Sequence, residues 1–198
     1  MPQTTHFSVR LSAKLVLEFA DFLNLPATVV VMPTRRIFNI KGHAHFVTFS
    51  CYHRRRLLNH DRAKQIVLSV FALQVEKQQV ESMGFVIMPD HVHSLIMFSG
   101  DGDNTIGSFM KQWKQQSSVQ LKKFLSSTLT EYTSKISLAD PVWQRRYYDY
   151  NVYSERKLTE KLEYMHNNPV RAGLVRKASD WRYSSAWFYE YGKACWNI

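Results

Sequence analysis

The chain has 198 residues, of which 45% are apolar, enough to bury the core of one domain with short appendages. Its 26 Lys and Arg residues against 16 Asp and Glu residues give a formal net charge of +10, which favours a polyanionic partner, nucleic acid before an anionic membrane surface. No apolar run approaches the roughly 18 residues of a membrane helix, and Glu18 and Asp21 interrupt the apolar stretch that a signal peptide would need. The two cysteines cannot build a disulfide framework, which excludes a disulfide-stabilised scaffold and favours the reducing cytoplasm.

Residues 1–31 are expected to be an extension of the domain. Apolar residues recur there at helical spacing as far as Pro26, and Met32 begins a basic segment that resembles a second start of the chain. Residues 1–31 are therefore either an appended docking helix or a stretch that precedes the natural start.

Strands and helices are expected from residue 45 onward in the order β-α-β-β-α-(β)-α. Apolar residues at every third or fourth position predict helices from Asp61, after the turn at 101–104, and after Ser154. The segments rich in β-forming residues are 45–51, 83–88, 91–98 and, more weakly, 142–150. This order predicts an α+β domain with a central antiparallel sheet and helices mainly on one face.

The C-terminal tail, residues 181–198, contains seven aromatic side chains. Exposing so many aromatic rings to water is unfavourable, so we expect the tail to fold back onto the domain.

Two histidines open the third expected strand, in the segment Met88-Pro89-Asp90-His91-Val92-His93. Side chains alternate faces along a strand, so His91 and His93 point the same way and could bind one divalent metal ion. The alternative is a strand with two polar residues near its end and no chemical role.

A tyrosine and an asparagine lie on the last expected helix. Tyr164 and Asn168 are four residues apart and so share one helix face. Pro169 is expected to move Asn168 out of the helical backbone region, which would free its amide oxygen. The alternatives are a packed tyrosine and an asparagine that caps the helix.

The segment 88–93, taken with YMHNNPVRAGLV at 164–175, closely resembles the REP-associated tyrosine transposases, a branch of the IS200-like single-tyrosine HUH transposases. The resemblance extends from about Met32 to Ser185. It implies a ferredoxin-like HUH fold, with residues 32–180 as the catalytic domain and 181–198 as a tail packed on it.

By this resemblance, His91, His93 and Asn168 match the metal ligands of the family, and Tyr164 matches its nucleophile. The resemblance implies Mg²⁺ or Mn²⁺, with Mn²⁺ better suited to two imidazoles. Tyr164 would attack single-stranded DNA to give a 5′-phosphotyrosine and a 3′-OH. An aryl phosphate is a good leaving group, so a second 3′-OH could reverse the step and transfer the strand.

The implied partner is single-stranded DNA that forms hairpins from palindromic repeats, and the chain would act as a monomer or a homodimer. Two alternatives remain open. One is a non-catalytic module that binds single-stranded or hairpin DNA and derives from such an enzyme. The other is a nickase that resembles replication initiators and shares the HUH chemistry.

Several basic side chains are candidate DNA contacts because phosphates bind Arg and Lys. They are Arg35, Arg36, Arg54, Arg55, Arg145, Arg146, Lys111 and Lys114. A second histidine pair, His43 and His45, is expected to be structural or to contact DNA. The tyrosines at 147, 148, 150 and 153 suit base stacking or core packing better than nucleophilic attack.

Overall fold

The computed structural model describes residues 44–98, 105–128, 137 and 139–192. The predictions for residues 1–31, for Arg35, Arg36 and His43, and for the last six residues of the tail lie outside this part of the chain.

Four strands form one sheet in the order β2-β3-β1-β4, and every neighbouring pair is antiparallel. The strands are β1 (Ala44–Ser50), β2 (Val80–Ile87), β3 (His91–Phe98) and β4 (Tyr148–Val152). The helices are α2 (Asp61–Lys77), α3 (Ile106–Thr128), α5 (Glu155–His166), α6 (Asn168–Arg171) and α7 (Ala186–Tyr191), with 3₁₀ turns η1 (Tyr52–Arg54) and η2 (Ala178–Asp180). The expected α+β class and antiparallel sheet are confirmed.

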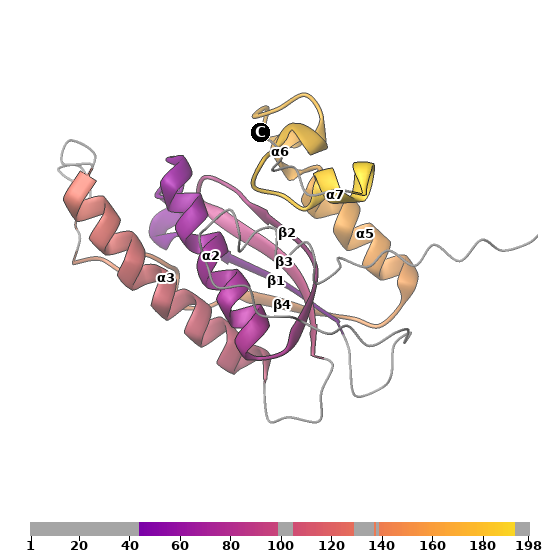
Figure 1. Cartoon of the computed structure of the whole chain (residues 1–198), viewed down its shortest axis with the longest axis horizontal. Coiled ribbons are helices and arrows are strands. Elements are labelled where there is room, and N and C mark those ends of the chain that lie inside the picture. Colours follow the sequence, from indigo (N-terminus) through magenta and orange to yellow (C-terminus); the bar gives the residue numbers. More distant parts are fainter. Residues whose placement is uncertain (1–43, 99–104, 129–136, 138, 193–198) are drawn as a thin grey trace, which may run out of the picture.

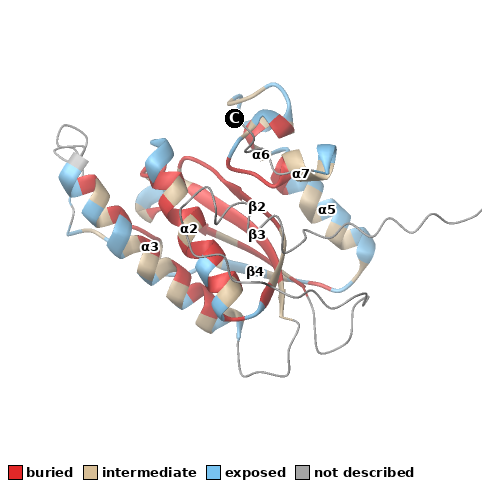
Figure 2. Cartoon of the chain, in the orientation of Figure 1, coloured by how far each residue is buried: buried red, intermediate tan, exposed pale blue. Residues whose placement is uncertain are grey.

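Helices lie on both sides of the sheet (Figure 1). The two longest, α2 and α3, share one face, and α5 with the short C-terminal helices lies on the other, so the helices cover both faces where the sequence predicted mainly one. Side chains along β1 alternate between these two faces. Val47 and Phe49 belong to the core under α2 and α3, whereas Phe46 belongs to the core under α5. Both sheet faces carry apolar residues, and Figure 2 shows the strands mostly buried between the two layers.

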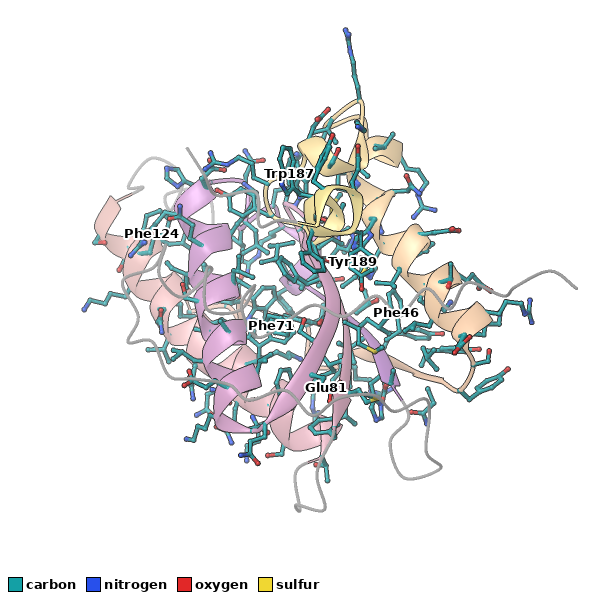
Figure 3. All side chains as sticks on the ribbon, turned by 45° about the vertical axis from the view of Figure 1, so that its right-hand side comes forward. Phe46, Phe71, Glu81, Phe124, Trp187 and Tyr189 are labelled. Carbon is teal, nitrogen blue, oxygen red and sulfur yellow. The ribbon has the colours of Figure 1, made fainter. Side chains whose placement is uncertain are left out.

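Two aromatic side chains mark these two cores. Phe71 of α2 and Phe46 of β1 lie on opposite sides of the sheet (Figure 3). Helix α5 comes close to β2 at Gly84, where an added Cβ would lie 2.3 Å from Met165 Cε and 2.7 Å from Leu162 Cδ2. A residue without a side chain at this position therefore allows α5 to sit directly on the sheet.

The segment that follows α6 packs along β2, which is an edge strand of the sheet. Ile87 N donates to Tyr183 O at 2.8 Å, and Trp181 Nε1 donates to Ile87 O at 3.0 Å. Ser185 Oγ then accepts from Phe85 N at 3.0 Å. These bonds occupy backbone groups that an edge strand would otherwise expose.

The extended segment at 142–150 is only partly strand. Trp143 makes an isolated bridge to Cys51, and its indole N–H donates to Ser117 Oγ at 3.1 Å inside the core. The regular strand begins at Tyr148, because only there does the chain pair continuously with β1.

No helix in the described part of the chain combines the length and apolar character needed to cross a bilayer.

Candidate active site

His91 and His93 begin β3 on the sheet face that α5 covers. Register places His93 opposite Thr48 of β1, and paired residues of antiparallel strands share a face. The two imidazole centroids are 4.9 Å apart. The strand alternation that predicted a shared direction for the two rings therefore holds in the structure.

His91 is oriented by the residue before it. Its Nδ1–H donates to Asp90 Oδ1 at 2.6 Å, and the other carboxylate oxygen, Oδ2, accepts from Arg54 Nε at 2.9 Å. Burial lowers the pKa of His91, although the hydrogen bond to Asp90 acts in the opposite direction. The carboxylate holds the ring in the tautomer whose lone pair is on Nε2.

Both ring nitrogens of His93 make hydrogen bonds. Asn168 Nδ2 donates to His93 Nε2 at 2.9 Å, so Nδ1 carries the proton and donates to Thr48 Oγ1 at 2.7 Å. Its ring stacks on Phe46 with centroids 5.5 Å apart. Burial lowers the pKa of His93 to about 3, so the ring is neutral at physiological pH.

Tyr164 lies on α5 beside this histidine. Its ring contacts His93 and Phe46 edge-on, with centroids 5.7 and 6.1 Å away, and the residue is 44% exposed. The Arg171 guanidinium sits 4.3 Å from the ring centre and donates to Tyr164 O at 2.9 Å. The phenol therefore reaches solvent while its ring is held on several sides.

Asn168 reaches the histidines from helical backbone. The chain turns only at Asn167 between α5 and α6, and Asn168 is the first residue of α6. The prediction that Pro169 moves Asn168 out of the helical region is wrong, because proline is tolerated in the first turn of a helix, where its missing N–H has no partner to lose.

The donor set fits a divalent metal ion. With each Nδ1 engaged, the imidazoles present Nε2 lone pairs, and a half turn of the Asn168 amide would present its oxygen in place of its NH₂ group. Metal-binding histidines usually donate their other ring N–H to an oxygen acceptor such as a carboxylate, which fixes the tautomer and the ring orientation, and here Asp90 and Thr48 supply the acceptors. The described residues contain no cluster of three or more His, Cys, Asp or Glu side chains suited to a metal, and the Asn168 amide is a further oxygen donor beside the imidazoles.

The basic side chains predicted to contact DNA differ in the protein groups that they contact. Arg54 joins the site through Asp90, whereas Arg55 pairs with Asp140 at 3.0 Å. Lys114 Nζ donates to Gln144 O at 2.7 Å and Arg145 O at 3.0 Å, and burial lowers the pKa of Lys114. Arg55 and Lys114 thus brace the segment before β4, while Lys111, Arg145 and Arg146 are exposed.

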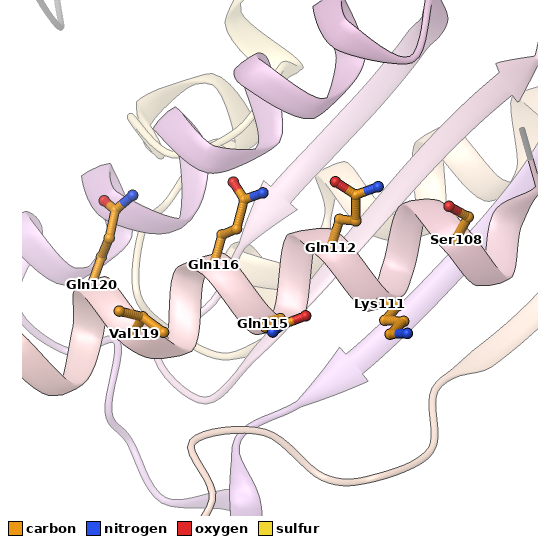
Figure 4. Close-up of a pocket in the computed structure, with 7 residues that line it drawn as sticks. All are labelled: Ser108, Lys111, Gln112, Gln115, Gln116, Val119 and Gln120. Carbon is orange, nitrogen blue, oxygen red and sulfur yellow. The ribbon is translucent and has the colours of Figure 1, made fainter.

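Two other features lie away from these histidines. His45 of the second histidine pair bonds Asp149 at 3.0 Å, which accounts for it structurally. A surface hollow of about 560 Å³ follows α3 and is lined by residues that include Lys111, Gln112 and Gln116 (Figure 4). Because α3 covers the opposite face of the sheet, this hollow is separate from the candidate site.

Sequence patterns did not single out Thr48, Asp90, Phe46 or Arg171. Asp90 had one available signal, since a carboxylate directly precedes a candidate metal-binding histidine. Thr48 and Phe46 enter the site through the pairing of β1 with β3, which no local pattern specifies.

The fold is that of a DNA transposase. A solved structure of a REP-associated tyrosine transposase bound to a REP hairpin matches with a TM-score of 0.59 and 21% identity, over 81% of this chain and 87% of that chain. The family model for IS200-like transposases matches residues 39–168, so this chain belongs to the IS200-like transposase family.

Two curated relatives carry related names. A protein of Haemophilus influenzae designated a candidate REP-associated tyrosine transposase is 28% identical, covering 76% of this chain and 83% of the relative. A REP-associated tyrosine transposase of Escherichia coli is 24% identical over 78% of this chain and 82% of the relative. The family resemblance noted in the sequence is thereby confirmed.

Proposed function

We propose that this transposase cleaves and rejoins single-stranded DNA through a covalent bond between Tyr164 and a 5′ phosphate. The observation that carries the proposal is the meeting of Tyr164, Asn168 and His93. The Asn168–His93 hydrogen bond joins residues 75 positions apart, and the exposed phenol stands beside them.

His91, His93 and Asn168 would hold Mg²⁺ or Mn²⁺ through two imidazole nitrogens and one amide oxygen. The bound cation would neutralise the phosphate oxygens, which otherwise repel an anionic nucleophile. Two imidazoles favour Mn²⁺ over Mg²⁺ on ligand chemistry. Asp90 and Thr48 would keep both rings in the tautomer that binds metal.

Tyr164 Oη would attack the scissile phosphorus and form a new P–O bond as the bond to the 3′ oxygen breaks. The phenol loses its proton, and the departing 3′ oxygen takes one up to become a 3′-OH. Attack by another 3′-OH on the phosphotyrosine reverses these changes and rejoins the strand without ATP, because the aryl oxide leaves readily.

The DNA partner in this proposal is a hairpin formed by palindromic repeats. Its support is the family, the solved neighbour bound to a REP hairpin and the net charge of +10. The chromosome would supply this substrate, so the proposed setting is the cytoplasm.

The test is an incubation of the full chain with a 3′-labelled single-stranded hairpin oligonucleotide and Mn²⁺, resolved on a denaturing gel. We expect the labelled strand to migrate with the protein and the released fragment to end in a 3′-OH. Salt-sensitive binding without any adduct would instead favour a non-catalytic DNA-binding module.

Thr48→Val should weaken Mn²⁺ binding about 10- to 100-fold, the usual cost of losing a partner that supports a metal-binding histidine. Valine keeps the shape of threonine but cannot accept the proton of His93 Nδ1. Isothermal titration with Mn²⁺ measures the effect.

Thr48→Ser is the matched control for this experiment, because serine retains the hydroxyl and should keep the affinity of the parent. Equal affinities for the valine and serine variants would show that Thr48 does not support the site.

A further inference from the structure

An exposed tyrosine lies on the same sheet face as the candidate site, one strand beyond Thr48. Thr48 pairs with His93 of β3 on one side and with Tyr148 of β4 on the other. Paired residues share a face, so His93, Thr48 and Tyr148 form one row across the sheet. The row spans two strand spacings, about 10 Å.

Tyr148 is 56% exposed on β4, the strand at the edge of the sheet opposite β2. The two nearest tyrosines are otherwise engaged. Tyr147, which precedes β4, packs against the core under α2 and α3, with Lys114 Nζ 6.0 Å from its ring centre. Tyr150 of β4 has Lys161 Nζ 4.8 Å from its ring centre. Among these tyrosines, Tyr148 is therefore the one whose ring solvent or a ligand can reach.

Positive charge gathers at the same end of the sheet. Gln144 N donates to Ser50 O at 2.9 Å, which brings the exposed Arg145 and Arg146 next to the end of β1. Arg54 Nη1 also reaches the end of β1, where it donates to Ser50 Oγ at 2.8 Å. An exposed aromatic ring at the same end of the sheet as several arginines matches the way single-stranded nucleic acid is bound, with the backbone on the cations and a base on the ring.

We propose that the Tyr148 ring is a stacking platform for one unpaired base of the DNA strand whose phosphate lies at His91 and His93. The inference rests on the proposed function for its ligand. A few nucleotides cover a span of about 10 Å, at about 3.4 Å of rise per nucleotide along one strand, so one strand can occupy both positions. Stacking uses the face of the base, so the platform would tolerate any base and position the strand.

Binding is measured by fluorescence anisotropy of a labelled single-stranded oligonucleotide with a hairpin and unpaired flanks, using the full chain with Tyr164→Phe so that no cleavage intervenes. Adding Tyr148→Ala should weaken binding about 5- to 150-fold, the range typical of one base stacked on an aromatic ring. Tyr148→Phe and Tyr148→Trp should bind like the parent, because stacking needs the ring and not the hydroxyl. Tyr153→Ala is the matched control: Tyr153 is 61% exposed but follows the other end of β4, and its loss should have no effect.

A scan with one abasic nucleotide at each unpaired position then identifies the stacked base. An abasic nucleotide at one position should weaken binding to the parent chain. The same nucleotide should cause no further loss of affinity in the chain that also carries Tyr148→Ala. Unchanged binding by Tyr148→Ala, or an equal loss with Tyr148→Phe, would overturn the platform while leaving the adduct assay of the wild-type chain unaffected. A wild-type chain that forms no adduct but shows the Tyr148 dependence would reject the proposed chemistry and keep the platform. No binding by the parent would reject both.

Discussion

Tyr164→Phe is expected to abolish the covalent adduct on a single-stranded hairpin oligonucleotide, with a loss of at least about 10³-fold in the rate of strand cleavage. Phenylalanine keeps the ring that contacts His93 and Phe46 and removes only the attacking oxygen. Binding of the uncleaved oligonucleotide should therefore change little. The measurement compares adduct on a denaturing gel with anisotropy on the same preparations.

Tyr153→Phe is the control for this substitution, since Tyr153 is more exposed than Tyr164 and lies outside the candidate site. It should form adduct at the rate of the wild-type chain. An adduct that persists in Tyr164→Phe would assign the nucleophile to another residue.

His93→Gln is expected to remove measurable Mn²⁺ binding and to lower strand cleavage by about 10³-fold, because the cation supplies several kcal/mol of charge stabilisation at the phosphate. Glutamine retains polarity and much of the volume at this buried position, but the imidazole Nε2 is lost. Titration with Mn²⁺ and the gel assay follow the two effects separately.

Chelation provides the second half of this experiment. EDTA should reduce cleavage by the wild-type chain to the level of His93→Gln and should not reduce the variant further. His45→Gln, which alters a histidine bonded to Asp149, should retain cleavage and its sensitivity to EDTA. Cleavage by the wild-type chain that survives chelation would contradict a metal-dependent reaction.

Local periodicity was sufficient for the histidine pair, which lies on one element. Alternation along β3 placed His91 and His93 on the same face. Helical spacing grouped Tyr164 with Asn168 on one helix, but the structure places them on two helices, α5 and α6, which are separated by Asn167. The rule for residues before proline failed at Asn168, because it does not consider that a new helix can begin there with proline in its first turn.

The remaining partners depend on tertiary structure. Thr48 supports His93 only because β1 and β3 pair in one register, and a shift of one residue would turn Thr48 to the other face. Composition also could not distinguish the roles of Arg54 and Arg55. Arg54 pairs with Asp90 in the candidate site, whereas Arg55 pairs with Asp140. The role of a basic side chain depends on which acceptors the fold brings near it.

The central claim is that Tyr164 becomes joined to the 5′ end of the cleaved strand. The most direct measurement is mass spectrometry of the adduct, isolated from the reaction with Mn²⁺ and digested with nuclease and protease. We predict a nucleotide 5′-phosphate on the peptide that contains Tyr164 and on no other tyrosine. A modified peptide that contains Tyr148, Tyr150 or Tyr153 instead, or the recovery of cleaved DNA without any modified peptide, would contradict this account.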